Sequence, residues 1–123
     1  MNHAPVLIAT LNRERHFKNC IASLAKCKGA VETPLYIALD YPPSEKYIKG
    51  YEAIKEFIPR ITGFKKIEVI KRKINYGPKS NFFTARDYLY KKYDAIINSE
   101  DDNEFSVDFL EFMNHSLTIH KSS

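Results

Sequence analysis

Three consecutive carboxylates, Glu100, Asp101 and Asp102, follow a short apolar segment, and they are the residues best suited to carry chemistry. Like charges about 4 Å apart repel by about 4 kcal/mol at an effective dielectric of 20, so their repulsion must be offset. One or two carboxylates can hold a divalent cation when diphosphate oxygens complete its shell. The triplet therefore predicts a site for Mn²⁺ or Mg²⁺ with a phosphorylated ligand, and a solvated acidic turn is the simpler alternative.

Other ligand-binding motifs are absent from the sequence. An EF-hand loop needs a glycine at its sixth position, and residues 100–111 contain none. No glycine-rich turn follows the first apolar segment, and no Walker lysine motif exists, which excludes dinucleotide and P-loop sites. The acidic triplet is thus not part of an EF-hand, a dinucleotide site or a P-loop.

The apolar pattern predicts alternating strands and helices. We expect strands over 5–10, 34–40, 66–72 and 94–99, and helices over 15–27, 51–58, 82–93 and from a cap at Ser106 onward. Such alternation indicates an α/β fold, a mostly parallel sheet of about four strands with helices on both faces. Ligands of these sheets bind beyond the carboxyl ends of the strands. That edge would gather Asn12, Arg13, Asp40, the region 73–77 and the acidic triplet.

Composition indicates one domain over residues 1–123, with 44% hydrophobic and 28% charged side chains. No apolar run is long enough to cross a bilayer and the first residues lack a signal-peptide pattern, so we expect a cytoplasmic protein. Cys20 and Cys27 lie about two helical turns apart, too far for a disulfide, and are expected in the core.

The net charge of +4 includes a dense group of lysines over 65–73. Because they alternate with Ile67 and Val69, a solvated strand edge is favoured over contact with an anionic ligand or a membrane surface. Association with a membrane periphery or with a partner subunit stays open. Nucleic acid is the least favoured partner, and we predict none.

Three segments resemble glycosyltransferases of the GT-A fold. Residues 99–112 resemble the acidic motif and following helix of the N-acetylglucosaminyltransferases that begin complex N-glycans. Residues 9–13 resemble the end of the first strand in those enzymes and in the family-two glycosyltransferases, and Leu39-Asp40 resembles the end of their second strand. The overlap covers most of the chain in order, and the acidic segment is its most specific part.

The resemblance implies a Rossmann-like nucleotide-binding half of a GT-A fold, with the triplet as its DXD motif. It implies a UDP-sugar donor, a saccharide or glycoconjugate acceptor, and transfer assisted by Mn²⁺ or Mg²⁺. The residues expected at the nucleotide sugar are Thr10, Asn12, Arg13, Asp40 (on the base), Lys79, Glu100 and Asp101 (on the ribose and sugar), with Asp102 on the metal.

The catalytic base of these families lies downstream of the acidic motif. We therefore expect residues 1–123 to be the N-terminal part of a larger glycosyltransferase. Two alternatives stay open: a nucleotide-sugar-binding module without turnover of its own, and a nucleotidyltransferase-like domain, although the latter would show a glycine-rich loop after strand one.

Overall fold

The computed structural model describes residues 3–122, with side chains to residue 117, and alternates strands and helices throughout. Its elements are β1 (Val6–Thr10), α1 (Glu14–Ala25), β2 (Pro34–Leu39), α2 (Ile48–Phe57), β3 (Lys66–Lys71), α3 (Pro78–Tyr90), β4 (Ile97–Glu100) and α4 (Phe109–Ser122). Short 3₁₀ turns, η1 (Ala30–Glu32), η2 (Glu45–Tyr47) and η3 (Ile58–Arg60), lie in the connections. The α/β fold expected from the sequence is confirmed.

The four strands form one parallel sheet in the order β3-β2-β1-β4. All six residues of β2 are buried, and β1 is buried except for Ala9 at intermediate exposure, as the near-continuous apolar runs predict for central parallel strands. The register pairs Thr10 with Leu39 and Ala9 with Glu100. The ends of β1, β2 and β4 therefore meet at one edge.

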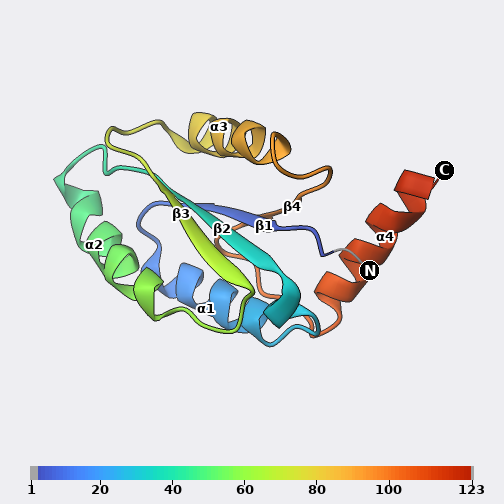
Figure 1. Ribbon diagram of the computed structural model, residues 1–123. Coiled ribbons are helices and arrows are strands. Elements are labelled where there is room, and N and C mark those ends of the chain that lie inside the picture. Colours follow the sequence, from blue (N-terminus) through green and yellow to red (C-terminus); the bar gives the residue numbers. More distant parts are fainter. Residues whose placement is uncertain (1–2, 123) are drawn as a thin grey trace.

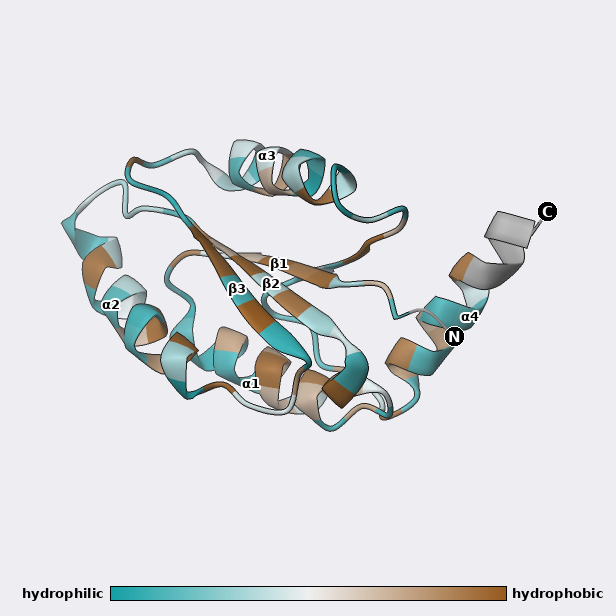
Figure 2. Cartoon of the chain, viewed as in Figure 1, coloured by the Kyte–Doolittle hydropathy of each residue, from teal (hydrophilic) through white to brown (hydrophobic). Residues whose placement is uncertain are grey.

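Helices cover both faces of the sheet, with α3 on one side and α1 and α2 on the other (Figure 1). Alternate strand residues divide between two cores: Val6 and Ile8 pack with α1, α2 and the start of α4, whereas Leu7 packs against α3. The brown, hydrophobic stretches of the strands and of α1 lie inside this sandwich (Figure 2).

Two predicted boundaries near the acidic triplet are wrong. The fourth strand begins at Ile97 rather than at residue 94, and the last helix begins at Phe109, not after a cap at Ser106. The last helix begins later because the segment before it is tied to α1 and to the turn after α1: the Phe105 N–H donates to Ser23 Oγ at 3.1 Å, and the Val107 carbonyl accepts from Lys28 N at 2.8 Å. These bonds hold the segment extended across the end of α1.

Cys20 and Cys27 are buried and unpaired, in agreement with the core positions predicted for them. Among the described residues, no helix has the length and apolar character needed to span a membrane.

Candidate functional site

A cavity of about 720 Å³ opens at the carboxyl edge of the sheet. Its lining comes from the ends of β1, β2 and β4, from the loop before α3 and from the first turns of α3. Six of the predicted site residues line it: Thr10, Asn12, Arg13, Asp40, Glu100 and Asp101. The topology thus brings together residues that lie up to 91 positions apart in the sequence.

Asp101 is the buried member of the acidic triplet, with 5% of its surface exposed. Thr10 Oγ1 donates a 2.8 Å hydrogen bond to its Oδ2, and Arg13 Nη2 donates to its Oδ1. Since β1 and β4 are paired neighbours, the strand-end threonine and the carboxylate face each other directly. Both oxygens of Asp101 are therefore held by β1 and the loop that follows it.

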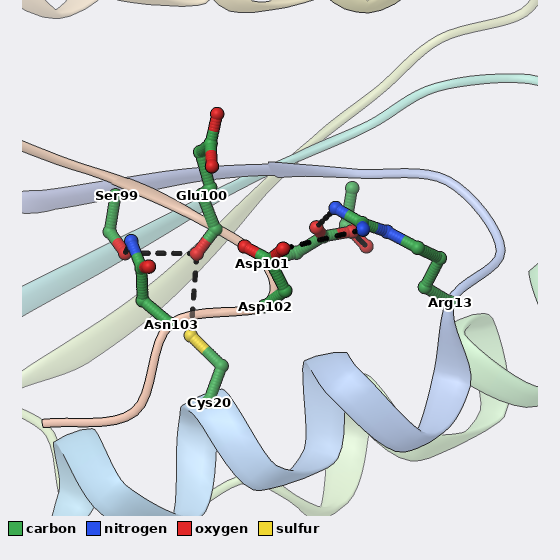
Figure 3. Close-up of polar contacts among 8 residues, drawn as sticks. Arg13, Cys20, Ser99, Glu100, Asp101, Asp102 and Asn103 are labelled. Atoms are coloured by element: carbon green, nitrogen blue, oxygen red, sulfur yellow. Dashed lines mark hydrogen bonds and ion pairs between the residues drawn. The ribbon is translucent and has the colours of Figure 1, made fainter.

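Arg13 is the internal counter-ion of the acidic turn. Its Nη1 lies 3.4 Å from Asp102 Oδ2, so the guanidinium spans two neighbouring carboxylates (Figure 3). Partial burial works to lower the pKa of Arg13, but its bond to Asp101 and the charges of Asp101, Asp102 and Glu100 outweigh this and raise it. The repulsion within the triplet, which the sequence argument assigned to a divalent ion alone, is offset here by a side chain of the same protein.

Glu100 is separated from its two acidic neighbours. Its side chain is exposed and points away from Asp101 and Asp102 (Figure 3). Beneath the turn, Cys20 Sγ lies 3.7 Å from the Glu100 carbonyl oxygen. Burial, followed by the charge of Asp101, raises the pKa of the Cys20 thiol to about 12. Cys20 is thus a neutral packing group under the turn.

Asp40 lines the cavity, but its carboxylate is almost fully engaged by the loop before α3. Oδ1 accepts from the backbone N–H groups of Tyr41 and Tyr76, both at 2.8 Å, and Oδ2 accepts from the Gly77 N–H at 3.0 Å. A longer contact of 3.4 Å comes from the Asn75 amide. Gly77 has a φ of 84°, a conformation that favours glycine. Asp40, 2% exposed, therefore fixes this loop.

The loop after β1 rests directly on α2. A Cβ atom added at Gly50 would lie 2.1 Å from the Asn12 carbonyl oxygen, so only glycine permits this approach. This contact fixes the position of the loop that carries Asn12 and Arg13 relative to α2. Gly50 is a supporting position that sequence reasoning missed, because a glycine inside a helix gives no sign of what touches it.

Two further polar residues of the cavity region were missed, Asn81 and Arg72. Asn81 is 1% exposed, donates to the Ala38 carbonyl at 2.9 Å and accepts from Arg72 Nε at 2.8 Å. It shares the buried face of α3 with Ala85 and Leu89. That four-residue spacing was a usable signal, because a polar residue in line with apolar ones needs a buried partner.

Lys79 is exposed and does not line the cavity, although its neighbour Pro78 does. Asp102 is not among the lining residues either; its side chain is 36% exposed, and within the described part of the chain its ion pair is with Arg13, at 3.4 Å. Among the residues whose side chains are described, no group of three or more histidine, cysteine, aspartate or glutamate residues could hold a metal.

Comparison with solved structures bears on this architecture. Two crystal structures of TarS from S. aureus, a GT-A-like glycosyltransferase, match with a TM-score of 0.65 at 15% and 17% sequence identity. The matches cover 95% of this chain in each case. The fold is glycosyltransferase-like. At this level of identity the likeness concerns the fold, and it does not extend to a specific N-acetylglucosaminyltransferase.

The chain spans only a part of these neighbours, 20% of one TarS chain and 32% of the other. No family model matches the sequence, and no curated protein matches it either. The site of this glycosyltransferase-like fold is therefore argued from its own residues.

Proposed function

We propose that this domain binds a UDP-sugar together with Mn²⁺ or Mg²⁺ and serves the transfer of the sugar to a saccharide or glycoconjugate acceptor. The observation that carries the proposal is the cavity at the carboxyl edge of a glycosyltransferase-like sheet, which Arg13 and Asp101 line and where Arg13 also pairs with the neighbouring Asp102. Its volume of about 720 Å³ suits a ligand of nucleotide-sugar size.

The acidic turn fits a cation that arrives with its ligand. Asp102 is half-exposed and has one long ion pair, so its carboxylate is the one free to exchange partners. Magnesium-type ions in nucleotide sites take one or two carboxylates and complete their shell with phosphate oxygens. When bound, the ion would neutralise charge on the departing diphosphate.

The remaining residues are assigned by their place around the cavity. Asp101, held by Thr10, would accept hydrogen bonds from a ribose or sugar hydroxyl, together with the exposed Glu100. At Asp40, the ring N–H of a uracil base would take the place of the 3.4 Å Asn75 contact, the weakest of the four. Arg13, once displaced from the carboxylates, would lie next to the diphosphate.

A nucleotide panel tests this proposal. Thermal shifts should be measured with UDP, GDP and their sugars, each with and without Mn²⁺. We expect UDP and UDP-sugars to raise the melting temperature more than GDP does, and only with the metal, because bound ligand stabilises the folded state. Absence of any metal-dependent shift with uridine nucleotides would overturn the proposal.

A nucleotide-sugar-binding module without turnover of its own is the second candidate. Release of free sugar from UDP-GlcNAc in the presence of Mn²⁺ separates the two. Turnover by this domain would establish an enzyme, and tight binding without release would establish the module.

A further inference from the structure

A second groove, of about 350 Å³, lies on the α2 side of the sheet edge, next to the first cavity. The segment after β2 divides the two: Asp40 and Pro43 line the first, and Tyr41 and Pro42 line the second. We call it the basic groove, and the residues on which the argument rests are Tyr41, Ile48, Tyr51, Lys55, Lys71 and Lys73.

Lys71 and Lys73 reach the basic groove from the end of the edge strand β3 and from the segment that follows it. Glu68 turns toward α3, where it accepts from Tyr88 Oη at 3.2 Å. Arg72 also borders the groove, but its guanidinium is engaged by α3, where it donates to Thr84 Oγ1 at 2.7 Å. Lys71, of the opposite parity to Glu68 in β3, therefore projects to the α2 side, and Lys73, two residues beyond the end of the strand, lines the same groove. Their charges add to one another instead of being spread over both faces.

The charge of the basic groove is not neutralised internally. Its acidic residue, Glu52, already pairs with Lys55 at 3.3 Å. Within the described part of the chain, neither Lys71 nor Lys73 forms a side-chain hydrogen bond or ion pair. Two ammonium groups at the mouth of one groove repel each other unless an anion lies between them.

The floor of the groove is apolar. The rings of Tyr41 and Tyr51 pack edge to face with centroids 5.9 Å apart, and Lys55 lies over the Tyr51 ring at 5.6 Å. Tyr41 and Ile48 are each 44% exposed, although both are large hydrophobic residues. Such a surface suits the carbon skeleton of a small ligand, as in other small-molecule sites.

We propose that the basic groove binds a phosphorylated small molecule about the size of a monosaccharide phosphate. The phosphate pairs with the ammonium groups of Lys71 and Lys73, and the organic part packs on Tyr41 and Ile48. Lysine is a common phosphate ligand, acting as a point charge. A volume of about 350 Å³ lies at the lower end of ligand sites. This site is separate from the proposed nucleotide-sugar site.

The test titrates the protein with glucose 6-phosphate, glucose or inorganic phosphate at moderate salt. Binding of each probe is monitored by the NMR chemical shifts of the backbone amides. We expect saturable shifts at Tyr41 and at residues 71–73 with the sugar phosphate, weaker binding of inorganic phosphate, and none of glucose. The double variant Lys71→Gln/Lys73→Gln should bind about tenfold or more weakly, as expected for losing charge-assisted hydrogen bonds.

The matched control is Lys26→Gln/Lys91→Gln, which removes the same charge from exposed positions outside the groove. This control should bind like the parent. Equal weakening in both double variants, shifts located elsewhere, or no saturation by the sugar phosphate would each overturn the proposal. Equal affinity for inorganic phosphate would overturn the part assigned to Tyr41 and Ile48. None of these outcomes depends on UDP binding.

Discussion

Two carboxylate sites on the same sheet edge are held in opposite ways. Asp40 is 2% exposed and receives three backbone N–H groups, at 2.8 to 3.0 Å, from Tyr41 and from the loop before α3. Asp101 and Asp102 are bridged by Arg13, a side chain that is itself 48% exposed. Backbone donors build a fixed support, whereas a half-exposed arginine is an exchangeable partner. The difference suggests that Asp40 shapes the cavity and the acidic turn responds to its ligand.

The strongest test of the fixed site is Asp40→Asn. The amide keeps one acceptor but turns an N–H donor toward the backbone N–H groups, which leaves buried donors unpaired. We expect urea denaturation to show a loss of about 2–3 kcal/mol in the free energy of unfolding. Asp87→Asn, whose side chain is 67% exposed, is the control and should change stability by less than about 0.5 kcal/mol. Equal stability of the two variants would place Asp40 among ordinary surface carboxylates.

Gly50→Ala tests whether the loop that carries Arg13 depends on its close approach to α2. Alanine normally favours a helix over glycine by about 1 kcal/mol. Here the new Cβ meets the Asn12 carbonyl at 2.1 Å, so we expect a loss of about 1–3 kcal/mol instead. Lys49→Ala, the exposed neighbour in the same helix, should be neutral or stabilising. If Gly50→Ala stabilises the protein instead, the loop after β1 can move away from α2 without a loss in the free energy of unfolding.

Arg13→Gln tests the exchangeable partner. Without its arginine, Asp101 keeps the bond from Thr10 alone, and stability should fall by about 1–2 kcal/mol, a modest loss because Arg13 is half-exposed. Mn²⁺ without nucleotide should then raise the melting temperature of the variant more than that of the parent, since the carboxylates are no longer occupied. Arg60→Gln, at an exposed i,i+4 pair, serves as the control. An equal gain in parent and variant would contradict competition between Arg13 and the metal.

At neutral pH the smallest expected effect is that of the Cys20 pKa shift, because the loss of stability it causes develops only above pH 9. The folded thiol keeps its proton to a pKa of about 12, whereas the reference value is 9.0. Between these values the folded state binds more protons than the unfolded state, so this contribution is complete below pH 9 and is lost as pH rises toward 12. Urea denaturation of the parent and of Cys20→Ala at both ends of that window measures it. An identical pH dependence in both proteins would contradict the burial of the Cys20 thiol under the acidic turn.

The sequence predicted the fold because strands and helices carry different periods. The apolar runs of β1 and β2 and the three- and four-residue spacing in α1 identify elements and faces without any knowledge of partners. The start of α4 could not be predicted in this way, since Ser106 is an acceptable cap by type. What decides is the tie of Phe105 and Val107 to the end of α1, a contact between residues about 80 positions apart.

The site was predicted in outline and not in its pairings. Strand ends in a parallel sheet meet at one edge, so Thr10, Asp40 and the acidic triplet could be placed together. The bridge from Arg13 to Asp101 and Asp102 depends on how closely the loop after β1 approaches Gly50. No periodic pattern in a single sequence predicts that approach. Asn81 was the one missed residue with a usable pattern, its alignment with Ala85 and Leu89.

The central claim is that the acidic turn couples a divalent cation to a uridine nucleotide through Asp102. Calorimetric titration of UDP, with and without Mn²⁺, into the parent, Asp102→Asn and the exposed control Glu104→Gln tests it directly. We predict that Mn²⁺ strengthens UDP binding in the parent and in Glu104→Gln, and that Asp102→Asn folds normally but loses this dependence, because its amide cannot share the charge of the ion. Equal strengthening by Mn²⁺ in the parent and in Asp102→Asn would contradict the account and leave the triplet as a solvated turn neutralised by Arg13.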